Sequence, residues 1–155
     1  MQSHPKHTSV RRYPDRYHLV VLRLCGMHLD PAKITKSLGL EPDSAQPSAD
    51  LGIKGRRIYK TKLGHWNLGS RLRRNAMLQN HVSDILEQIR PKKRVLRRIL
   101  RSVDADLTIA VEPHEAVVIA AYLFPADVIA EFTSLGIDIR FSIHIPGKKG
   151  FTSGG

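Results

Sequence analysis

Residues 19–40, "LVVLRLCGMHLDPAKITKSLGL", decide the fold class because they join a strand to a helix with clear ends. The aliphatic run at the start is typical of a buried strand. Asp30 is a favoured N-cap residue and Pro31 fits the first helical position, while Gly39 is placed to end the helix. The stretch therefore predicts one strand–helix unit.

A second stretch repeats this pattern near the other end of the chain. Residues 117–137 run from an aliphatic segment through a helix that begins near Pro125 to "SLG" and an aliphatic residue, and residues 137–145 then alternate as a closing strand. Two such units on a shared sheet are typical of ferredoxin-like folds. Chance is the alternative explanation, because Pro starts and Gly stops are common to all helices.

Between these units, apolar spacing predicts a helix over 75–89 and another over 92–102, with Pro91 at the break. Alternating or aliphatic segments predict strands at 65–68 and 105–113. The sequence therefore predicts an α+β fold with an antiparallel or mixed sheet and helices mainly on one face.

The predicted domain spans residues 17–145, which is long enough for a real core. Residues 1–16 predict a flexible basic arm and residues 146–155 a flexible tail. Residues 41–57 carry Pro, Gly, Asp and Ser at the density of a long internal loop. The first apolar run is broken by Arg23, so the sequence predicts no membrane-spanning or secretory segment.

The one cysteine, Cys25, can form no internal disulfide and is predicted to be a small buried hydrophobic residue. A chain without disulfides fits a reducing compartment, and we predict a cytoplasmic location. No two of the eight histidines share a predicted helix at spacing i, i+4, and no nucleotide-binding or hydrolase motif is present. The sequence therefore predicts no metal or other cofactor and leaves catalysis unsupported.

Charge is unevenly distributed along the chain, whose formal net charge is +11. Residues 54–101 hold 15 Lys and Arg against two acidic residues, whereas residues 102–147 hold one base and seven acids. Such a polarised chain favours anionic partners, although the acidic segment is also able to neutralise part of the basic one.

The densest basic stretch is "IRPKKRVLRRILRS", residues 89–102. Its last four arginines fall at spacing i, i+3, i+4 and i+7, so they share one helix face. An ordinary solvated face mixes charges of both signs, but no acid stands between Glu87 and Asp104. If the basic clusters of the chain converge, about six to eight phosphate contacts are available. The predicted nucleic-acid-binding residues are Arg71, Arg73, Arg74, Lys92, Lys93, Arg94, Arg97, Arg98 and Arg101.

Trp66 allows two interpretations. It is either a core residue that closes the sheet or the aromatic floor of a pocket. The candidate pocket residues are His65, Trp66, Ser70 and His81.

Several segments in order resemble one bacterial family. They are "ITKSLGLEPD", a Gly-containing loop, "WNLGSRL", a helix with a central His before "ILEQI", and the closing "AVVIAAYLFPADVIAEFTSLGIDIRFSI". The matching positions are Ile34, Thr35, Leu38, Gly39, Leu40, Pro42, Asp43, Gly52, Trp66, Leu68, Ser70, His81, Leu86 and Leu96. Over residues 17–144 the chain resembles the family catalogued as domain of unknown function 4279. The resemblance implies a small α+β domain and no established activity, and the Arg-dense helix goes beyond the family pattern.

The leading functional prediction is a non-enzymatic domain that binds nucleic acid or another polyanion through residues 54–101. The alternative is a protein–protein interaction module, either immunity-type or homodimeric, with no nucleic-acid role. The net charge counts against an inhibitor that mimics the substrate of a nuclease. A third interpretation is an enzyme or ligand pocket around Trp66 and the loop at 41–57.

Overall fold

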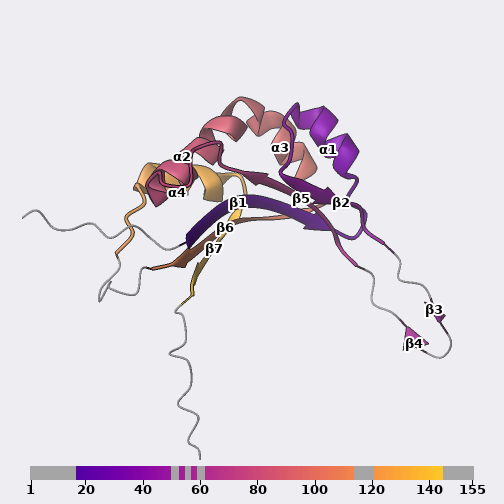
Figure 1. The fold of residues 1–155 in the computed structure, drawn as a ribbon. Coiled ribbons are helices and arrows are strands. Elements are labelled where there is room, and N and C mark those ends of the chain that lie inside the picture. The colour runs from indigo at the N-terminus through magenta and orange to yellow at the C-terminus, as the bar shows by residue number, and fades with distance from the viewer. Residues whose placement is uncertain (1–16, 50–52, 55–56, 59–61, 114–120, 145–155) are drawn as a thin grey trace, which may run out of the picture.

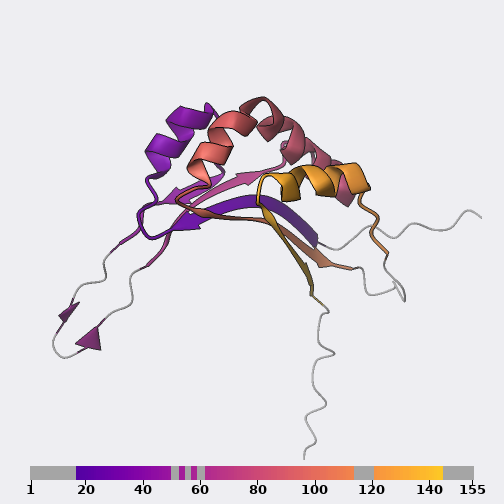
Figure 2. The ribbon, with the colours of Figure 1, turned by 180° about the vertical axis from the view of Figure 1, so that it is seen from behind.

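A mixed β-sheet of five strands carries α-helices on one of its faces (Figures 1 and 2). The structure is a computed structural model that describes residues 17–49, 53–54, 57–58, 62–113 and 121–144. The strands are β1 (Tyr17–Gly26), β2 (Ser44–Gln46), β3 (Ile53–Lys54), β4 (Arg57–Ile58), β5 (Gly64–Gly69), β6 (Asp104–Glu112) and β7 (Asp138–Ile143). The helices are α1 (Pro31–Leu38), α2 (Leu78–Ile89), the 3-10 helix η1 (Arg90–Lys92), α3 (Lys93–Ile99) and α4 (Ala126–Ser134). The α+β class and the placement of helices mainly on one face are confirmed.

The order of the strands in the main sheet is β2-β5-β1-β6-β7. All neighbours are antiparallel except β6 and β7, which are parallel. Strand β5 therefore lies between β1 and β2, and β1 lies between β5 and β6. Each of the units β1–α1–β2 and β5–α2–α3–β6 is thus split by a strand of the other, which is the split βαβ connection. Helix α4 and strand β7 add one parallel strand outside this pattern.

The second predicted strand–helix unit, at 117–137, is only half correct. Helix α4 forms, but residues 121–125 lie in no strand, and residues 114–120 are outside the described part of the chain. The aromatic side chains of Tyr122 and Phe124 instead pack on Phe141 of β7, with ring centroids 5.7 and 6.3 Å apart. The sequence could not separate aromatic packing from strand pairing in this apolar run.

The predicted loop at 41–57 also contains strands. Strand β2 pairs with β5 from Ser44 opposite Asn67 to Gln46 opposite His65, and β3 pairs with β4. All three residues of β2 are exposed, and prolines flank the strand at Pro42 and Pro47. A short, exposed edge strand has no apolar pattern, so the sequence made it look like a loop.

The ends of α1 are as predicted. Asp30 Oδ1 accepts a hydrogen bond from the backbone N–H of Lys33 at 3.1 Å. Gly39 has a φ of 62°, and its N–H donates to the carbonyl of Thr35 at 2.8 Å. The left-handed conformation at this C-cap favours glycine.

The core lies between the helices and the inward face of β1, β5 and β6. Trp66 is fully buried there, and its Nε1–H donates to Thr35 Oγ1 at 3.0 Å. Leu22 and Leu107, which are opposite one another in the sheet, are also fully buried. The interpretation of Trp66 as a core residue is therefore confirmed.

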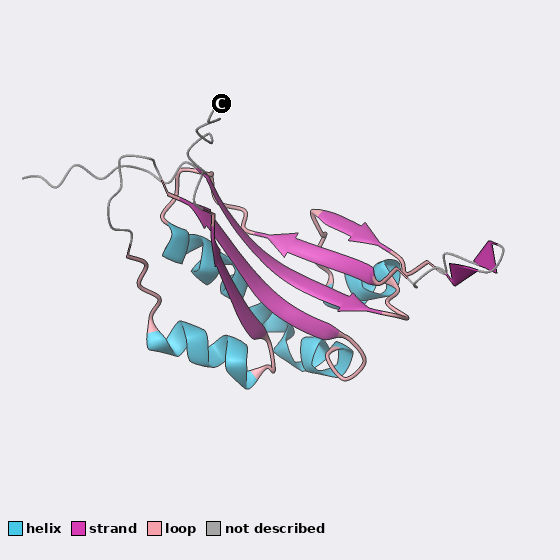
Figure 3. Ribbon diagram, turned by 90° about the horizontal axis from the view of Figure 1, so that it is seen from below, coloured by secondary structure: helices cyan, strands magenta, loops and turns pink. Residues whose placement is uncertain are grey.

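The other face of the sheet, seen in Figure 3, carries no helix among the described residues. Alternation along β1 places Arg23 and Cys25 on this open face. Cys25 is half-buried rather than buried, so the prediction of a core position for it is wrong. In the described part of the chain, no helix is long and apolar enough to cross a membrane.

Candidate functional site

Helix α3 has one apolar side and one cationic side. Leu96 is fully buried, with Val95 and Ile99 packed beside the core. The 3.6-residue period turns the three arginines of α3 outward, and they are exposed, as is Arg101 in the turn after the helix. Arg94, Arg97, Arg98 and Arg101 line a surface hollow of about 370 Å³, which we call the arginine hollow.

No carboxylate of the residues that the structure describes lines the arginine hollow. Across the described residues, none of its four guanidinium groups makes a hydrogen bond or an ion pair. Four like charges at helical spacings of three and four repel one another. An anion that enters the hollow would relieve this repulsion.

The preceding turn of the same basic stretch is partly neutralised. Arg90 donates to Glu131 of α4 at 2.8 and 3.2 Å, and Lys93 Nζ donates to the same carboxylate at 2.6 Å. These hydrogen bonds, from Arg90 first and then Lys93, lower the pKa of Glu131 to about 2. The acidic C-terminal segment therefore offsets part of the positive charge at the start of α3 but none in the arginine hollow.

Lys92 also has a structural position. Its side chain is half-buried, and its Nζ lies beside Gly39 at the C-terminus of α1. A cation at this end of a helix is favourable because the last carbonyls point toward it. Of the predicted nucleic-acid-binding residues, Lys93 thus has an ion-pair partner and Lys92 lies at the end of a helix.

Arg71 likewise serves the fold. Its backbone N–H and its guanidinium donate to the buried carboxylate of Asp84 at 2.8 and 3.1 Å. Burial raises the pKa of Asp84, but hydrogen bonds from Arg71 and Ser70 outweigh that effect, and the pKa lies below its ordinary value. Arg71 therefore fixes the loop before α2.

The basic clusters do not meet in one place. Arg73 and Arg74 are exposed in the loop before α2, whereas the arginine hollow follows α2. The 12 residues of α2 separate the two by about 18 Å along the helix. Figure 1 shows α2 and α3 arching one after the other over the sheet. The cluster around residues 54–60 lies where no side chain is described.

The candidate pocket residues do not converge either. Trp66 points into the core, so its strand neighbour His65 points to the open face. Ser70 Oγ accepts a hydrogen bond from the N–H of Leu72 at 3.1 Å. His81 is buried on α2 against His18, with ring centroids 4.8 Å apart. These four side chains therefore do not line one common space among the described residues, and a pocket at Trp66 stays a prediction.

His18, which is half-buried, and His81, which is buried, form a polar pair. The Nε2 atom of each has no hydrogen-bond partner among the described residues. Burial first, and then the nearby His18, lower the pKa of His81, while Asp84 acts in the opposite direction. Burial and the nearby His18 therefore favour the uncharged form of the His81 ring. Among the described residues, no group of three or more His, Cys, Asp or Glu could hold a metal ion.

A cleft that the sequence did not predict lies next to the arginine hollow. It runs between α1 and α3, has a volume of about 580 Å³, and shares Arg98 with the hollow. Its walls come from spacing i, i+1, i+4 on α1 and i, i+3, i+4 on α3. Ile34, Val95 and Ile99 of these walls belong to the apolar stripes visible in the sequence, which predicted contact with the core rather than a space between the helices.

Fold and site together define a small α+β domain with an exposed arginine hollow. A family model described as domain of unknown function (DUF4279) matches residues 15–146, and the chain belongs to this family. The resemblance inferred from the sequence is thus confirmed. No curated protein and no solved structure matches the chain.

Proposed function

We propose that the protein is a non-enzymatic binding domain that takes nucleic acid or another polyanion at the arginine hollow. The supporting observation is that its four exposed guanidinium groups surround one hollow and, among the described residues, share no carboxylate. Arginine is suited to this task because its planar fork donates two parallel hydrogen bonds to a phosphate.

The number of free arginines sets the expected salt dependence. Four phosphate contacts correspond to a slope of about −3 to −4 in a plot of log affinity against log salt concentration. This slope is shallower than that of six to eight contacts, because the cluster before α2 lies apart from the hollow. Binding would therefore be modest and tolerant of sequence.

The test is a fluorescence-anisotropy titration with short single- and double-stranded RNA and DNA at low and moderate salt. A heparin competition distinguishes nucleic acid from other polyanions. The variant replaces Arg94, Arg97, Arg98 and Arg101 with Gln, and we expect it to lose binding and the salt slope.

A matched control removes four positive charges elsewhere. Lys36, Lys62, Arg73 and Arg74 are all exposed, and replacing them with Gln leaves the arginine hollow intact. We expect this control to retain most of the affinity. Equal losses in both variants would mean that net charge alone drives binding, and absent binding at low salt would refute the proposal.

A second candidate function is self-association or protein binding through β7. In the described part of the chain this strand pairs only with β6, so one edge has no strand neighbour. Phe141 and Ile143 on it are 41% and 52% exposed. Free edges and exposed apolar side chains are common at interfaces. Sedimentation of wild type and Phe141→Lys over a concentration series tests it, because an apolar complex survives high salt and the variant would stay monomeric.

A further inference from the structure

The cleft between α1 and α3 has the size and the lining of a small-molecule site. We call it the α1–α3 cleft. Its volume of about 580 Å³ is within the range of ordinary ligand pockets. The residues that line it are His28, Leu29, Asp30, Lys33, Ile34, Ser37, Val95, Arg98, Ile99, Ser102 and Val103.

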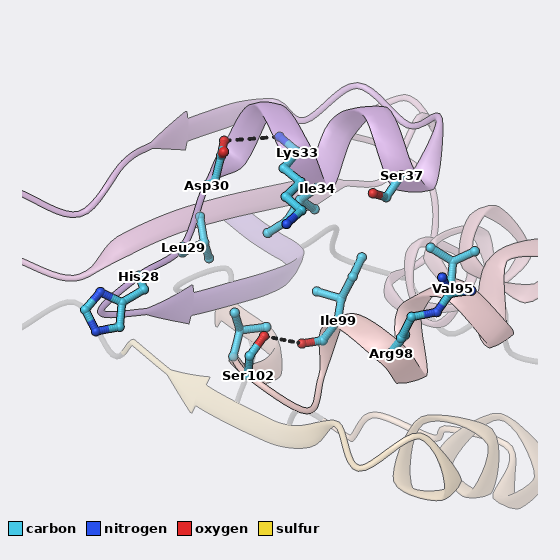
Figure 4. A pocket seen from close by; sticks show the side chains of 11 residues that line it. His28, Leu29, Asp30, Lys33, Ile34, Ser37, Val95, Arg98, Ile99 and Ser102 are labelled. Carbon is cyan, nitrogen blue, oxygen red and sulfur yellow. Dashed lines mark hydrogen bonds between the residues drawn. The ribbon is translucent and has the colours of Figure 1, made fainter.

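The interior of the cleft is aliphatic. Figure 4 shows Leu29 and Ile34 on one side of the space between the helices and Ile99 on the other. Leu29 and Ile34 belong to the core, whereas Ile99 and Val95 are only partly buried because the cleft leaves one side of each uncovered. Apolar surface of this kind gains free energy when a ligand removes it from water.

The polar side chains that line the cleft are those of His28, Asp30, Lys33, Ser37, Arg98 and Ser102. Asp30 accepts the helix-capping hydrogen bond from Lys33, and Ser102 Oγ donates to the carbonyl of Ile99. The guanidinium of Arg98 makes no such bond among the described residues and lines both the cleft and the arginine hollow. A ligand in the cleft therefore meets concentrated positive charge at one end.

We infer that the α1–α3 cleft binds an amphiphile with an anionic head and an aliphatic body, such as an alkyl phosphate. This inference rests on the proposed anion-binding role of the arginine hollow and names a ligand class for it. The head lies at Arg98 and the neighbouring arginines, and the chain lies against Ile34 and Ile99. A stacked nucleobase fits less well, since base stacking uses aromatic side chains and His28 is the only ring among the described residues of the lining.

Calorimetric titration with inorganic phosphate and with butyl, hexyl and octyl phosphate tests the aliphatic part. Each methylene that enters the cleft should strengthen binding about fourfold until the cleft is full. The four-arginine variant should lose binding of all four compounds. An affinity that does not depend on chain length would overturn the inference.

A steric block tests the location. Ser37 lines the cleft and is exposed, so Ser37→Leu fills the space without disturbing the core. We expect octyl phosphate to bind at least about tenfold more weakly, which is the loss of roughly two buried methylenes. Ala32→Leu is the matched control, because Ala32 is exposed on the same helix but does not line the cleft. Unchanged octyl phosphate binding in Ser37→Leu would refute the site.

The anionic amphiphile could come from solution or from a membrane lipid. Co-sedimentation with vesicles of phosphatidylglycerol and phosphatidylcholine separates the two sources. Vesicle binding that Ser37→Leu abolishes identifies a lipid, whereas octyl phosphate binding without vesicle binding identifies a soluble ligand. If Ser37→Leu left vesicle binding intact and affinity did not depend on chain length, neither a lipid nor a soluble amphiphile would be the ligand of the cleft.

The same variant keeps the two proposals distinguishable. Ser37→Leu leaves all four arginines of the hollow in place, so it should bind RNA and heparin as wild type does. Failure of wild type to bind any polyanion would refute the proposed function. Polyanion binding without a chain-length effect would refute the cleft alone.

Discussion

The open face of the sheet and the outer face of α3 use arginine in opposite ways. On the sheet, Arg23 of β1 donates two hydrogen bonds to Asp106 of β6, at 2.6 and 3.1 Å, and Arg140 lies 3.6 Å from the same carboxylate. On α3 and in the turn after it, the four arginines of the hollow have no carboxylate partner in the described part of the chain. The arginines on the sheet stabilise the fold, whereas the positive charges of the arginine hollow are not paired with a carboxylate of the described residues. The difference separates structural charge from charge that is available to a ligand.

The largest loss of stability should come from removing the carboxylate of Asp106, which Arg23 and Arg140 both face on the open side of the sheet. Asp106 is only 7% exposed, and Asp106→Ala would leave Arg23 without its partner across the strands. Removal of one member of a partly buried ion pair costs about 2 to 4 kcal/mol of unfolding free energy. Urea denaturation measures this. Asp104→Ala, at an exposed position of the same strand, is the control and should change stability by less than about 0.5 kcal/mol.

Substitutions in the arginine hollow should raise the unfolding free energy, which is the opposite of the effect of Asp106→Ala. Replacing its four arginines with Gln removes four like-charge pairs at spacings of three and four, each of which costs a few tenths of a kcal/mol. We expect the unfolding free energy to rise by up to about 1 kcal/mol at low salt while polyanion binding is lost. Urea denaturation at low and high salt is the measurement. A loss of stability would show that these arginines serve the fold after all.

His81 adds a third case to the comparison, because its burial favours the uncharged form of a basic side chain. Because the folded-state pKa of His81 lies below that of the unfolded chain, the unfolded state takes up a proton first as the pH falls. Stability should therefore be complete above pH 7 and decline as the pH falls through the unfolded value of about 6.5, by at most about 1.4 kcal/mol per pH unit for one proton. Urea midpoints at pH 7.5 and 5.5 test this.

The corresponding variants separate His81 from the other histidines. His81→Gln should flatten the pH dependence between those two values, although it also lowers stability at both. His28 is exposed, and His28→Gln should retain the wild-type profile. An unchanged slope in His81→Gln would assign the acid sensitivity to another group.

The sequence predicted the helices and strands better than the ion pairs between side chains. The ends of α1, the apolar side of α3 and the core position of Trp66 follow from local patterns that span a few residues. Local patterns say nothing about which carboxylate meets which base, so the pairing of Arg71 with Asp84 was missed, as was the pairing of Arg90 with Glu131. The α1–α3 cleft was missed for the same reason, since a space between two helices depends on how far apart the fold holds them.

The smallest effect should come from converting paired charge into free charge. Glu131→Gln releases Arg90 and Lys93, which precede the arginine hollow on the same stretch. If free cations are what bind the ligand, polyanion affinity should rise and the salt slope should steepen by one to two units. The change in stability should be small, because Arg90 is half exposed in the pair, and surface pairs contribute little. The stabilisation from Glu131 should be present above the unfolded carboxyl pKa of about 4.5 and lost as the pH falls toward about 2. Anisotropy titration at several salt concentrations measures the polyanion affinity and the salt slope of Glu131→Gln. An unchanged slope would mean that the position of the hollow, rather than the number of free cations on the stretch, limits binding.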